Sequence, residues 1–247
     1  MVDVVIPISV SGIWRPFISD NPTRSGSIGI TVILEPYSFA RVTEGEGVYL
    51  NGNPVKMKNL EYLEAKMGKV RVNMESEVPL GFGYGMSASI SLAYALGASQ
   101  IRGIDPEQAA LLAHESEVIS GNGLGDVVSQ FFGRNIVYRE RPGFPPYGVI
   151  RIFEISSDDI YSKPLEALPT KSILQPLDVS FTLINEFLSN PSIDKFFEVS
   201  RKFTEALGFT SPFPNSFRKK GLILKLGKPE SDSWIRHRIA SRGAYVE

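Results

Sequence analysis

Three glycines, Gly81, Gly83 and Gly85, stand at alternate positions just before a segment rich in alanine and serine. Without a Cβ atom the backbone can approach a ligand closely, and the first N–H groups of a helix have no partner within that helix. The helix dipole adds partial positive charge at the same end, so phosphate is the natural ligand. The spacing therefore predicts a phosphate-binding loop with these candidate residues: Gly81, Gly83, Tyr84, Gly85, Met86, Ser87, Ala88 and Ser89.

Three interpretations of this loop compete. A Walker-A loop needs Gly-Lys followed by Ser or Thr, and Met86 follows Gly85 instead, which excludes it. A dinucleotide-binding fingerprint is formally met from Gly83 to Ala88, but the preceding strand is half polar and no βαβ unit surrounds it. The third interpretation is a glycine-rich turn that only leads into a buried helix, and the loop residues alone leave it open.

A second glycine-rich segment, 120–125, follows a predicted helix and ends at Asp126. An aspartate within reach of a substrate hydroxyl can accept its proton, whereas an aspartate that closes a turn ordinarily caps a helix. The preceding helix carries Glu115 and Glu117, oxygen donors suited to a hard cation, although a lone glutamate is more often part of a solvated face. Ser87 likewise suits either a cation ligand or an N-cap.

The elements that position these residues follow from periodicity and turn signals. Strands with antiparallel features are predicted over Val4–Val10, Gly29–Leu34, Tyr37–Val42, Val48–Leu50 and Lys69–Glu75. One helix is predicted over Ala88–Leu96 with a stop near Gly97, and a second after the cap signal Asp105-Pro106. Farther along, the pattern predicts helices over Val179–Leu188 and Asp194–Leu207, and strands over Val149–Ile155, Leu222–Leu226 and Ala244–Val246.

This order of elements indicates an α+β protein of two packed subdomains, residues 1–150 and 151–247. The 247 residues contain no cysteine, which excludes disulfides, thiolate nucleophiles and iron–sulfur clusters, and only two histidines, His114 and His237. A net charge of −1 argues against a nucleic-acid partner. No apolar run is long enough to span a membrane, and the N-terminal residues lack the features of a signal peptide, so we expect a soluble, cytoplasmic protein.

The segment Pro79-x-Gly81-x-Gly83-x-Gly85-x-Ser87-Ala88-Ser89 resembles the nucleotide-phosphate loop of the GHMP kinase superfamily. Further similarity, over Arg24–Gly29, Ala113-His114 with Glu117, Gly123–Val127, Thr170–Leu174 and Gly243-Ala244, points to the archaeal branch that phosphorylates pantoate. The resemblance spans most of the chain. It implies the two-subdomain GHMP fold, with an N-terminal part like domain 2 of ribosomal protein S5 and a ferredoxin-like C-terminal part.

The resemblance also implies a chemistry, in which ATP and Mg2+ are used to phosphorylate the primary hydroxyl of pantoate to 4-phosphopantoate for coenzyme A synthesis. Ser87 and Glu117 would hold Mg2+, with Glu115 as the rival, and Asp126 would act on the acceptor hydroxyl. Arg24 with Ser27 would bind the pantoate carboxylate, with Arg15 as a second option. The alternatives are another acceptor alcohol (mevalonate, phosphomevalonate or homoserine) or a nucleotide-binding protein without turnover; the resemblance leaves a homodimer open.

The chain departs from the superfamily pattern at three places. Met86 stands where the first serine of the loop is usual, and Ser11–Pro16 replaces the usual Pro-Gly-Lys-like segment. The third motif, usually glycine-rich, is Ser216–Gly221 with one glycine and three cations. Either Lys219 or Lys220 contacts phosphate there, or this motif is degenerate.

Overall fold

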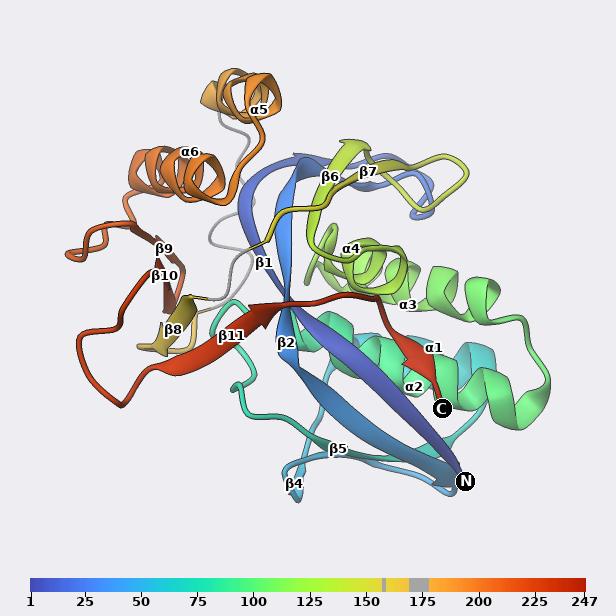
Figure 1. Ribbon diagram of the computed structural model, residues 1–247. Coiled ribbons are helices and arrows are strands. Elements are labelled where there is room, and N and C mark those ends of the chain that lie inside the picture. The colour runs from blue at the N-terminus through green and yellow to red at the C-terminus, as the bar shows by residue number, and fades with distance from the viewer. Residues whose placement is uncertain (157–158, 169–177) are drawn as a thin grey trace.

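The computed structural model describes residues 1–156, 159–168 and 178–247, and it confirms the α+β class (Figure 1). Within these residues the strands form one mixed sheet, whose longest path runs β4-β3-β5-β2-β11-β8-β10-β9. The strands are β1 (Val2–Phe17), β2 (Gly26–Glu44), β3 (Val48–Leu50), β4 (Asn53–Pro54), β5 (Val70–Glu75), β6 (Ile136–Arg141), β7 (Val149–Phe153), β8 (Ile160–Pro164), β9 (Ser216–Lys219), β10 (Leu222–Leu226), β11 (Ile235–Ile239) and β12 (Tyr245–Val246). The helices are α1 (Lys58–Met67), α2 (Met86–Arg102), α3 (Pro106–Ser120), α4 (Asp126–Phe132), α5 (Val179–Ser189) and α6 (Ile193–Ala206).

The two longest described strands, β1 and β2, form an antiparallel pair. The sequence predicts two strands, 29–34 and 37–42, but β2 is continuous through Pro36. The β1–β2 register shifts between Ile6 and Ile8, so Pro36 lies at an irregularity where its missing N–H group breaks no regular ladder. Next to this point β11 pairs with Glu35 and joins the C-terminal strands to the same sheet.

Helix α2 is buried along most of its length between the β1–β2 pair and the neighbouring helices (Figure 1). The prediction that it stops near Gly97 is wrong, because it continues to Arg102 and ends at Gly103 with φ 67°. Gly97 has a packing role instead: a Cβ atom there would lie 2.4 Å from Val42 Cγ2. The predicted start of α3 is confirmed, since the Asp105 side chain accepts hydrogen bonds from two N–H groups of its first turn.

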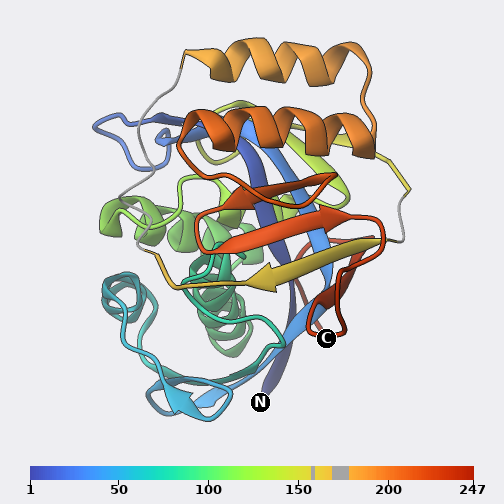
Figure 2. The same ribbon diagram turned by 90° about the vertical axis from the view of Figure 1, so that its left-hand side faces the viewer.

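In the C-terminal part, strands β8, β10 and β9 form one end of the sheet, and α5 and α6 stack beside it (Figure 2). The predicted helices and the strand Leu222–Leu226 are confirmed here. The chain then returns, because β11 pairs with β2 and β12 pairs with β1. The predicted boundary near residue 150 falls within β7, which pairs with β6, and the division into 1–150 and 151–247 stays a prediction.

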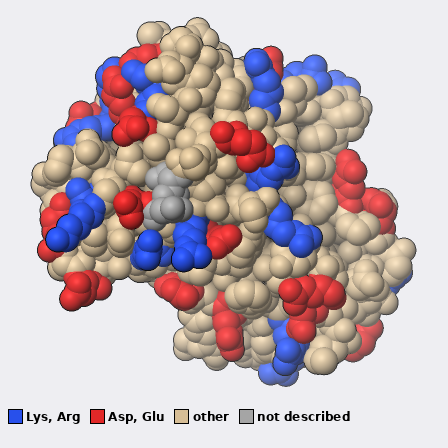
Figure 3. Space-filling model, in the orientation of Figure 1, with Lys and Arg blue, Asp and Glu red and all other residues tan. Residues whose placement is uncertain are grey.

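Several elements were not predicted: α1, α4, β4, β6, β8, β9 and β11. The segment Thr170–Leu174, which carried part of the family resemblance, lies outside the described residues. Among the described helices, none is both long and apolar enough to cross a membrane. On the face drawn in Figure 3, cationic and anionic side chains are interspersed, in keeping with the net charge of −1.

Candidate active site

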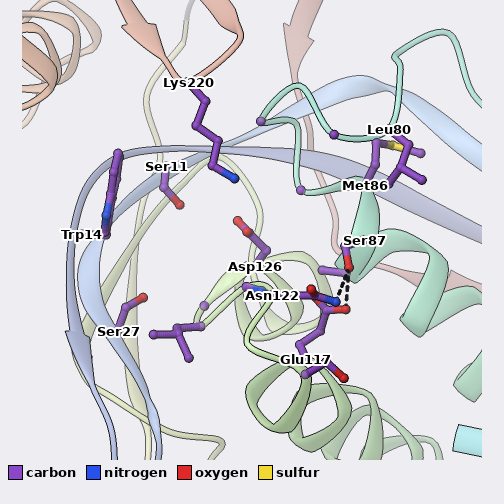
Figure 4. A pocket seen from close by; sticks show the side chains of 18 of the residues that line it. Ser11, Trp14, Ser27, Leu80, Met86, Ser87, Glu117, Asn122, Asp126 and Lys220 are labelled. Atoms are coloured by element: carbon purple, nitrogen blue, oxygen red, sulfur yellow. Dashed lines mark hydrogen bonds between the residues drawn. The ribbon is translucent and has the colours of Figure 1, made fainter. Parts of the chain in front are cut away.

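A cavity of about 450 Å³ lies where the glycine loop, the start of α2, the end of α3 and the start of α4 meet β1 and the β9–β10 turn (Figure 4). Most of the predicted site residues line it: Gly81, Gly83, Gly85, Met86, Ser87, Ala88, Glu117, Asp126 and Ser27. The structure thus gathers residues from distant parts of the sequence around one space.

The glycine loop needs its glycines for conformation and for close approach. Gly81, Gly83 and Gly85 have φ values of 95°, 115° and 72°, in the left-handed region that favours glycine. A Cβ atom on Gly85 would lie 2.2 Å from Ser9 Oγ and 2.7 Å from Gln130 Nε2. Substitution at Gly85 would therefore disturb both the loop and the residues that support it.

The N-terminus of α2 faces the cavity. Gly85 precedes it in a left-handed conformation, and within the described chain no side chain caps this helix end. Its first-turn N–H groups therefore lack helical partners, which makes the start of α2 a ready anion site. Met86, the unusual residue of the loop, is buried, and the Ser76 hydroxyl lies 3.6 Å from its sulfur.

Glu117 is held by neutral hydrogen-bond donors beside the start of α2. The side chain is 1% exposed, and its Oε1 accepts hydrogen bonds from Ser87 Oγ at 2.7 Å and Ser91 Oγ at 2.9 Å. Asn59 Nδ2 donates to the same oxygen at 2.7 Å, and the Gly123 N–H donates to Oε2 at 3.2 Å. Burial raises the pKa of Glu117 because the charged form loses its hydration, while the hydrogen bonds from Ser87, Gly123 and Ser91 act in the opposite direction.

These residues fit a Mg2+ ion. Mg2+ prefers oxygen ligands and is usually bound through one or two carboxylates together with substrate phosphates and water. The Ser87 hydroxyl and the Glu117 carboxylate supply such oxygens beside the predicted phosphate site, and none of the four donors to Glu117 carries a positive charge. No cluster of three or more His, Asp or Glu suited to a metal occurs among the described residues.

Asp126, at the first position of α4, lies in the middle of the cavity (Figure 4). Its Oδ1 accepts a hydrogen bond from Ser9 Oγ at 3.0 Å. Ser9 is held in turn by Gln130 Nε2, at 3.0 Å, and Gln130 also donates to the carbonyl oxygen of Gly85 at 3.1 Å. The carboxylate is thereby tied to the glycine loop while it remains open to the cavity.

Cations surround Asp126 on two sides. Lys219 and Lys220, from the β9–β10 turn, line the cavity and are 5% and 6% exposed. Arg139 lies buried behind Gly125, where its Nε donates to the carbonyl oxygen of Ser27 at 3.1 Å. Burial lowers the pKa of Arg139 to about 10, and the nearby Asp126 carboxylate acts in the opposite direction.

Five residues named by the sequence analysis do not line the cavity: Tyr84, Glu115, Arg24, Ser89 and Arg15. Glu115 accepts hydrogen bonds from Thr23 and Tyr62 on another side of α3, so Glu117 is the glutamate that meets Ser87. Arg24 is exposed, with its guanidinium 4.6 Å from the Tyr147 ring centroid, and Ser89 faces Gln130. Arg15 lies 3.8 Å from Asp178. The substrate role of Arg24 stays a prediction.

Tyr84, the remaining loop residue, points away from the cavity into a buried chain of hydrogen bonds. Its hydroxyl lies 2.8 Å from Ser162 Oγ, which lies 2.6 Å from His237 Nε2. His237 Nδ1 lies 2.8 Å from the Glu35 carbonyl oxygen, an acceptor, so Nδ1 carries the proton and Nε2 accepts from Ser162. Burial lowers the pKa of His237 to about 4, and Tyr84 therefore anchors the loop to a neutral histidine of β11.

Sequence reasoning missed several residues of the site. Two of them had a signal, because Ser91 and Gln130 each follow a predicted site residue by four positions on a helix, which places them on the same face. Asn122 lies within the second glycine-rich segment, 120–125, and its Nδ2 donates to Ser87 Oγ at 3.2 Å. The others depend on strand pairing or on the return of distant segments, and no local pattern identifies them: Ser9, Ser11, Trp14, Asn59 and Arg139.

A glycine loop that leads into a buried helix, with a serine, a glutamate and an aspartate around one cavity in this α+β fold, defines a kinase of the GHMP type. Residues 55–134 match the model of the GHMP kinases N terminal domain. The pantoate kinase of Thermococcus kodakarensis is 31% identical over 231 residues, which cover 84% of this chain and 76% of that protein. The pantoate kinase of Methanospirillum hungatei is also 31% identical, over 85% of this chain and 77% of that protein.

The fold comparison agrees with these relatives. A solved structure described as a phosphotransferase related to the CoA biosynthesis pathway superposes with a TM-score of 0.82 at 24% identity, covering 100% of this chain and 99% of that one. The chain belongs to the GHMP kinase superfamily and, within it, to the family of the pantoate kinases.

Proposed function

We propose that the protein is an ATP-dependent kinase that phosphorylates the primary hydroxyl of pantoate to 4-phosphopantoate, a step of coenzyme A synthesis. Its membership of the pantoate kinase family supports the substrate. The observation that carries the reaction type is the position of Asp126, which lies between the uncapped start of α2 and the Ser11–Ser27 side of the same cavity (Figure 4). A carboxylate there can meet an acceptor hydroxyl that faces the phosphates.

The nucleotide's phosphates would bind to the N–H groups of the glycine loop and of the first turn of α2. Phosphoryl transfer needs alignment and charge neutralisation more than covalent help from the protein. Ser87 and Glu117 would hold Mg2+, which supplies positive charge to the phosphate oxygens when bound. The hydrogen bond between these two residues, 2.7 Å long, supports their assignment to one ligand.

The acceptor would lie on the opposite side of Asp126, against Ser11, Ser27 and the Trp14 ring. Asp126 would accept the proton of the hydroxyl as that oxygen bonds to the γ-phosphorus, and the bridging oxygen would leave with ADP. The buried guanidinium of Arg139 behind Ser27 supports an anionic acceptor, because its charge lies close to this wall.

The test is release of ADP by the purified protein with ATP and Mg2+ and, in separate reactions, pantoate, mevalonate or homoserine. We expect turnover with pantoate and a phosphorylated product at its primary hydroxyl, checked by NMR. Turnover with another alcohol alone would keep the reaction class and discard the substrate. ATP binding without ADP release for any acceptor would discard the kinase and favour a nucleotide-binding protein.

A further inference from the structure

Two adjacent lysines, Lys219 and Lys220, are almost completely buried in the cavity wall next to the glycine loop. Their exposed fractions are 5% and 6%, and both line the same cavity as Ser87 and Asp126. A buried ammonium group loses its hydration, and the Asp126 carboxylate is close enough to act on the charge of both lysines. The roles proposed for the glycine loop and for the acceptor residues Ser11, Ser27 and Trp14 do not involve these two charges.

The β9–β10 turn fixes where the lysines lie. Lys220 has a φ value of 53°, and its carbonyl oxygen accepts a hydrogen bond from Arg218 Nε at 2.9 Å. Arg218 is itself paired with Glu166 at 2.6 Å. A Cβ atom on Gly83 would lie 3.1 Å from the Lys219 carbonyl oxygen, so the turn lies directly against the glycine loop. The turn is therefore positioned with respect to the loop through its backbone.

The side chain of Lys220 extends from this turn toward Asp126 and Ser11, on the side of the cavity away from Glu117 (Figure 4). Its ammonium group thus lies between the start of α2, where the phosphates would bind, and Ser11, where the acceptor would lie (Figure 4). Three cations, Lys219, Lys220 and Arg139, face or flank Asp126, and Lys58 lines the same cavity. Among the described lining residues, the carboxylates are Asp126 and Glu117. A further anion bound between Asp126 and Lys220 would balance this charge.

We propose that Lys220 is a catalytic residue, whose ammonium group contacts the γ-phosphoryl group of ATP at the point of transfer. This inference rests on the proposed kinase function. As the acceptor oxygen bonds to the γ-phosphorus, the bond from that phosphorus to the β–γ bridging oxygen breaks, and ADP keeps the electron pair. The acceptor proton passes to Asp126, while Lys220 stays protonated and stabilises the charge on the γ-phosphoryl oxygens.

The titration of Lys220 gives the proposal a pH signature. Burial, and next the charge of Lys219, lower the pKa of Lys220 to about 8, while Asp126 acts in the opposite direction. Among the described residues, the charged groups that line the cavity or flank this turn are Lys58, Lys219, Asp126, Arg139, Glu117 and the Arg218–Glu166 pair. The protonated form is the active one, so activity falls as the pH rises through about 8. An arginine at this position stays charged and moves the alkaline limit upward.

The experiment uses Lys220→Met and Lys220→Arg, with Lys220→Gly as a variant that relieves the left-handed backbone. The matched control is Lys225→Met, because Lys225 is 5% exposed on the neighbouring strand, pairs with Glu230 at 3.2 Å and does not line the cavity. Calorimetry measures the affinities for ATP and ADP. We expect Lys220→Met and Lys220→Gly to weaken ATP binding about tenfold with little change for ADP, and to lower kcat about a hundredfold.

The nucleotide titrations separate this proposal from the function on which it rests, because they need no acceptor. Equal losses of ATP and ADP affinity would place Lys220 at the α- or β-phosphate and overturn the proposal. Unchanged kcat in a folded Lys220→Gly variant, or an alkaline limit that does not move in Lys220→Arg, would also overturn it. Failure of pantoate as acceptor, with the ATP-specific loss intact, would refute the substrate and leave the role of Lys220 standing.

Discussion

Glu117 and Asp126 are two carboxylates of one cavity, nine positions apart in the sequence, and their surroundings are opposite in kind. Glu117 is 1% exposed and accepts hydrogen bonds from neutral groups, among them Ser87, Ser91 and Asn59. Asp126 has one such donor in the described chain, Ser9, and lies among cationic side chains.

The difference assigns different tasks to the two groups. Neutral donors fix the position of Glu117 but do not balance its charge. This arrangement suits a carboxylate that binds a metal cation. Asp126 lies among Lys219, Lys220 and Arg139, and its one described donor, Ser9, occupies Oδ1 and leaves the other oxygen open to the hydroxyl of a substrate. The largest expected effects come from neutralising each carboxylate in turn.

Asp126→Asn is expected to have the largest effect. The amide keeps the shape of the side chain but cannot accept the hydroxyl proton, so kcat should fall by at least about a hundredfold. The affinity for ATP, measured by calorimetry, should change little, because the glycine loop and the start of α2 remain intact. Asp105→Asn, at the N-cap of α3, is the control, since asparagine also caps helices. A loss of ATP binding as large as the loss of kcat would assign Asp126 to nucleotide binding instead.

Glu117→Gln should cause a smaller loss of activity, about tenfold at saturating Mg2+, together with a marked rise in the Mg2+ concentration needed for half-maximal rate. Glu115→Gln is the matched control on the same helix, because Glu115 bonds to Thr23 and Tyr62 away from the cavity. If both variants needed the same Mg2+ concentration as the wild type, Glu117 would not be a ligand.

The same variant gives a pH test of stability without any ligand. Burial raises the pKa of Glu117 above its ordinary value of 4.5, so the wild-type protein loses stability as the pH rises past that value and the buried group ionises. Glutamine does not ionise. The Tm of Glu117→Gln relative to wild type should therefore rise from pH 5 to pH 8, by about 2–4 °C for each kcal/mol. A Tm difference independent of pH would contradict the burial of an ionised carboxylate.

The sequence predicted the nucleotide side of the cavity better than the acceptor side. Glycines with positive φ and the residues that begin a helix leave local signals, so the loop and Ser87 could be located without a structure. Glu115 and Glu117 could not be separated, because residues two apart lie on different sides of a helix and only tertiary packing decides which side faces the cavity.

The acceptor side depends on pairing between distant strands, which no local pattern specifies. Arg139 reaches Ser27 because β6 pairs with β2. The β9–β10 turn, which carries Lys219 and Lys220, reaches Gly83 because these two strands form a hairpin at the far end of the sheet. The third motif, Ser216–Gly221, contains a single glycine, Gly221. Its positive φ occurs at Lys220, where the backbone makes the turn and the side chain enters the cavity.

The smallest effect is expected from Ser9→Ala, which removes the hydrogen bond to Asp126 and leaves the carboxylate itself. Gln130 keeps its bond to the Gly85 carbonyl oxygen, 3.1 Å long, so the glycine loop should stay in place. Because the cations around Asp126 remain, loss of this one hydrogen bond is expected to cost about 0.5–1 kcal/mol net, so kcat should fall roughly two- to fivefold with an unchanged KM for ATP.

Ser38→Ala is the control for this serine, because Ser38 is also fully buried on the β1–β2 pair and bonds to Ser76 at 2.9 Å outside the cavity. It should lower the Tm as much as Ser9→Ala does while leaving kcat unchanged. A kcat for Ser9→Ala as low as that of Asp126→Asn would mean that Ser9 contacts the substrate directly. An unchanged kcat would mean that the cations around Asp126 suffice to orient it. Asp126 would then be positioned by charge alone, whereas Glu117 is positioned by hydrogen bonds from neutral groups.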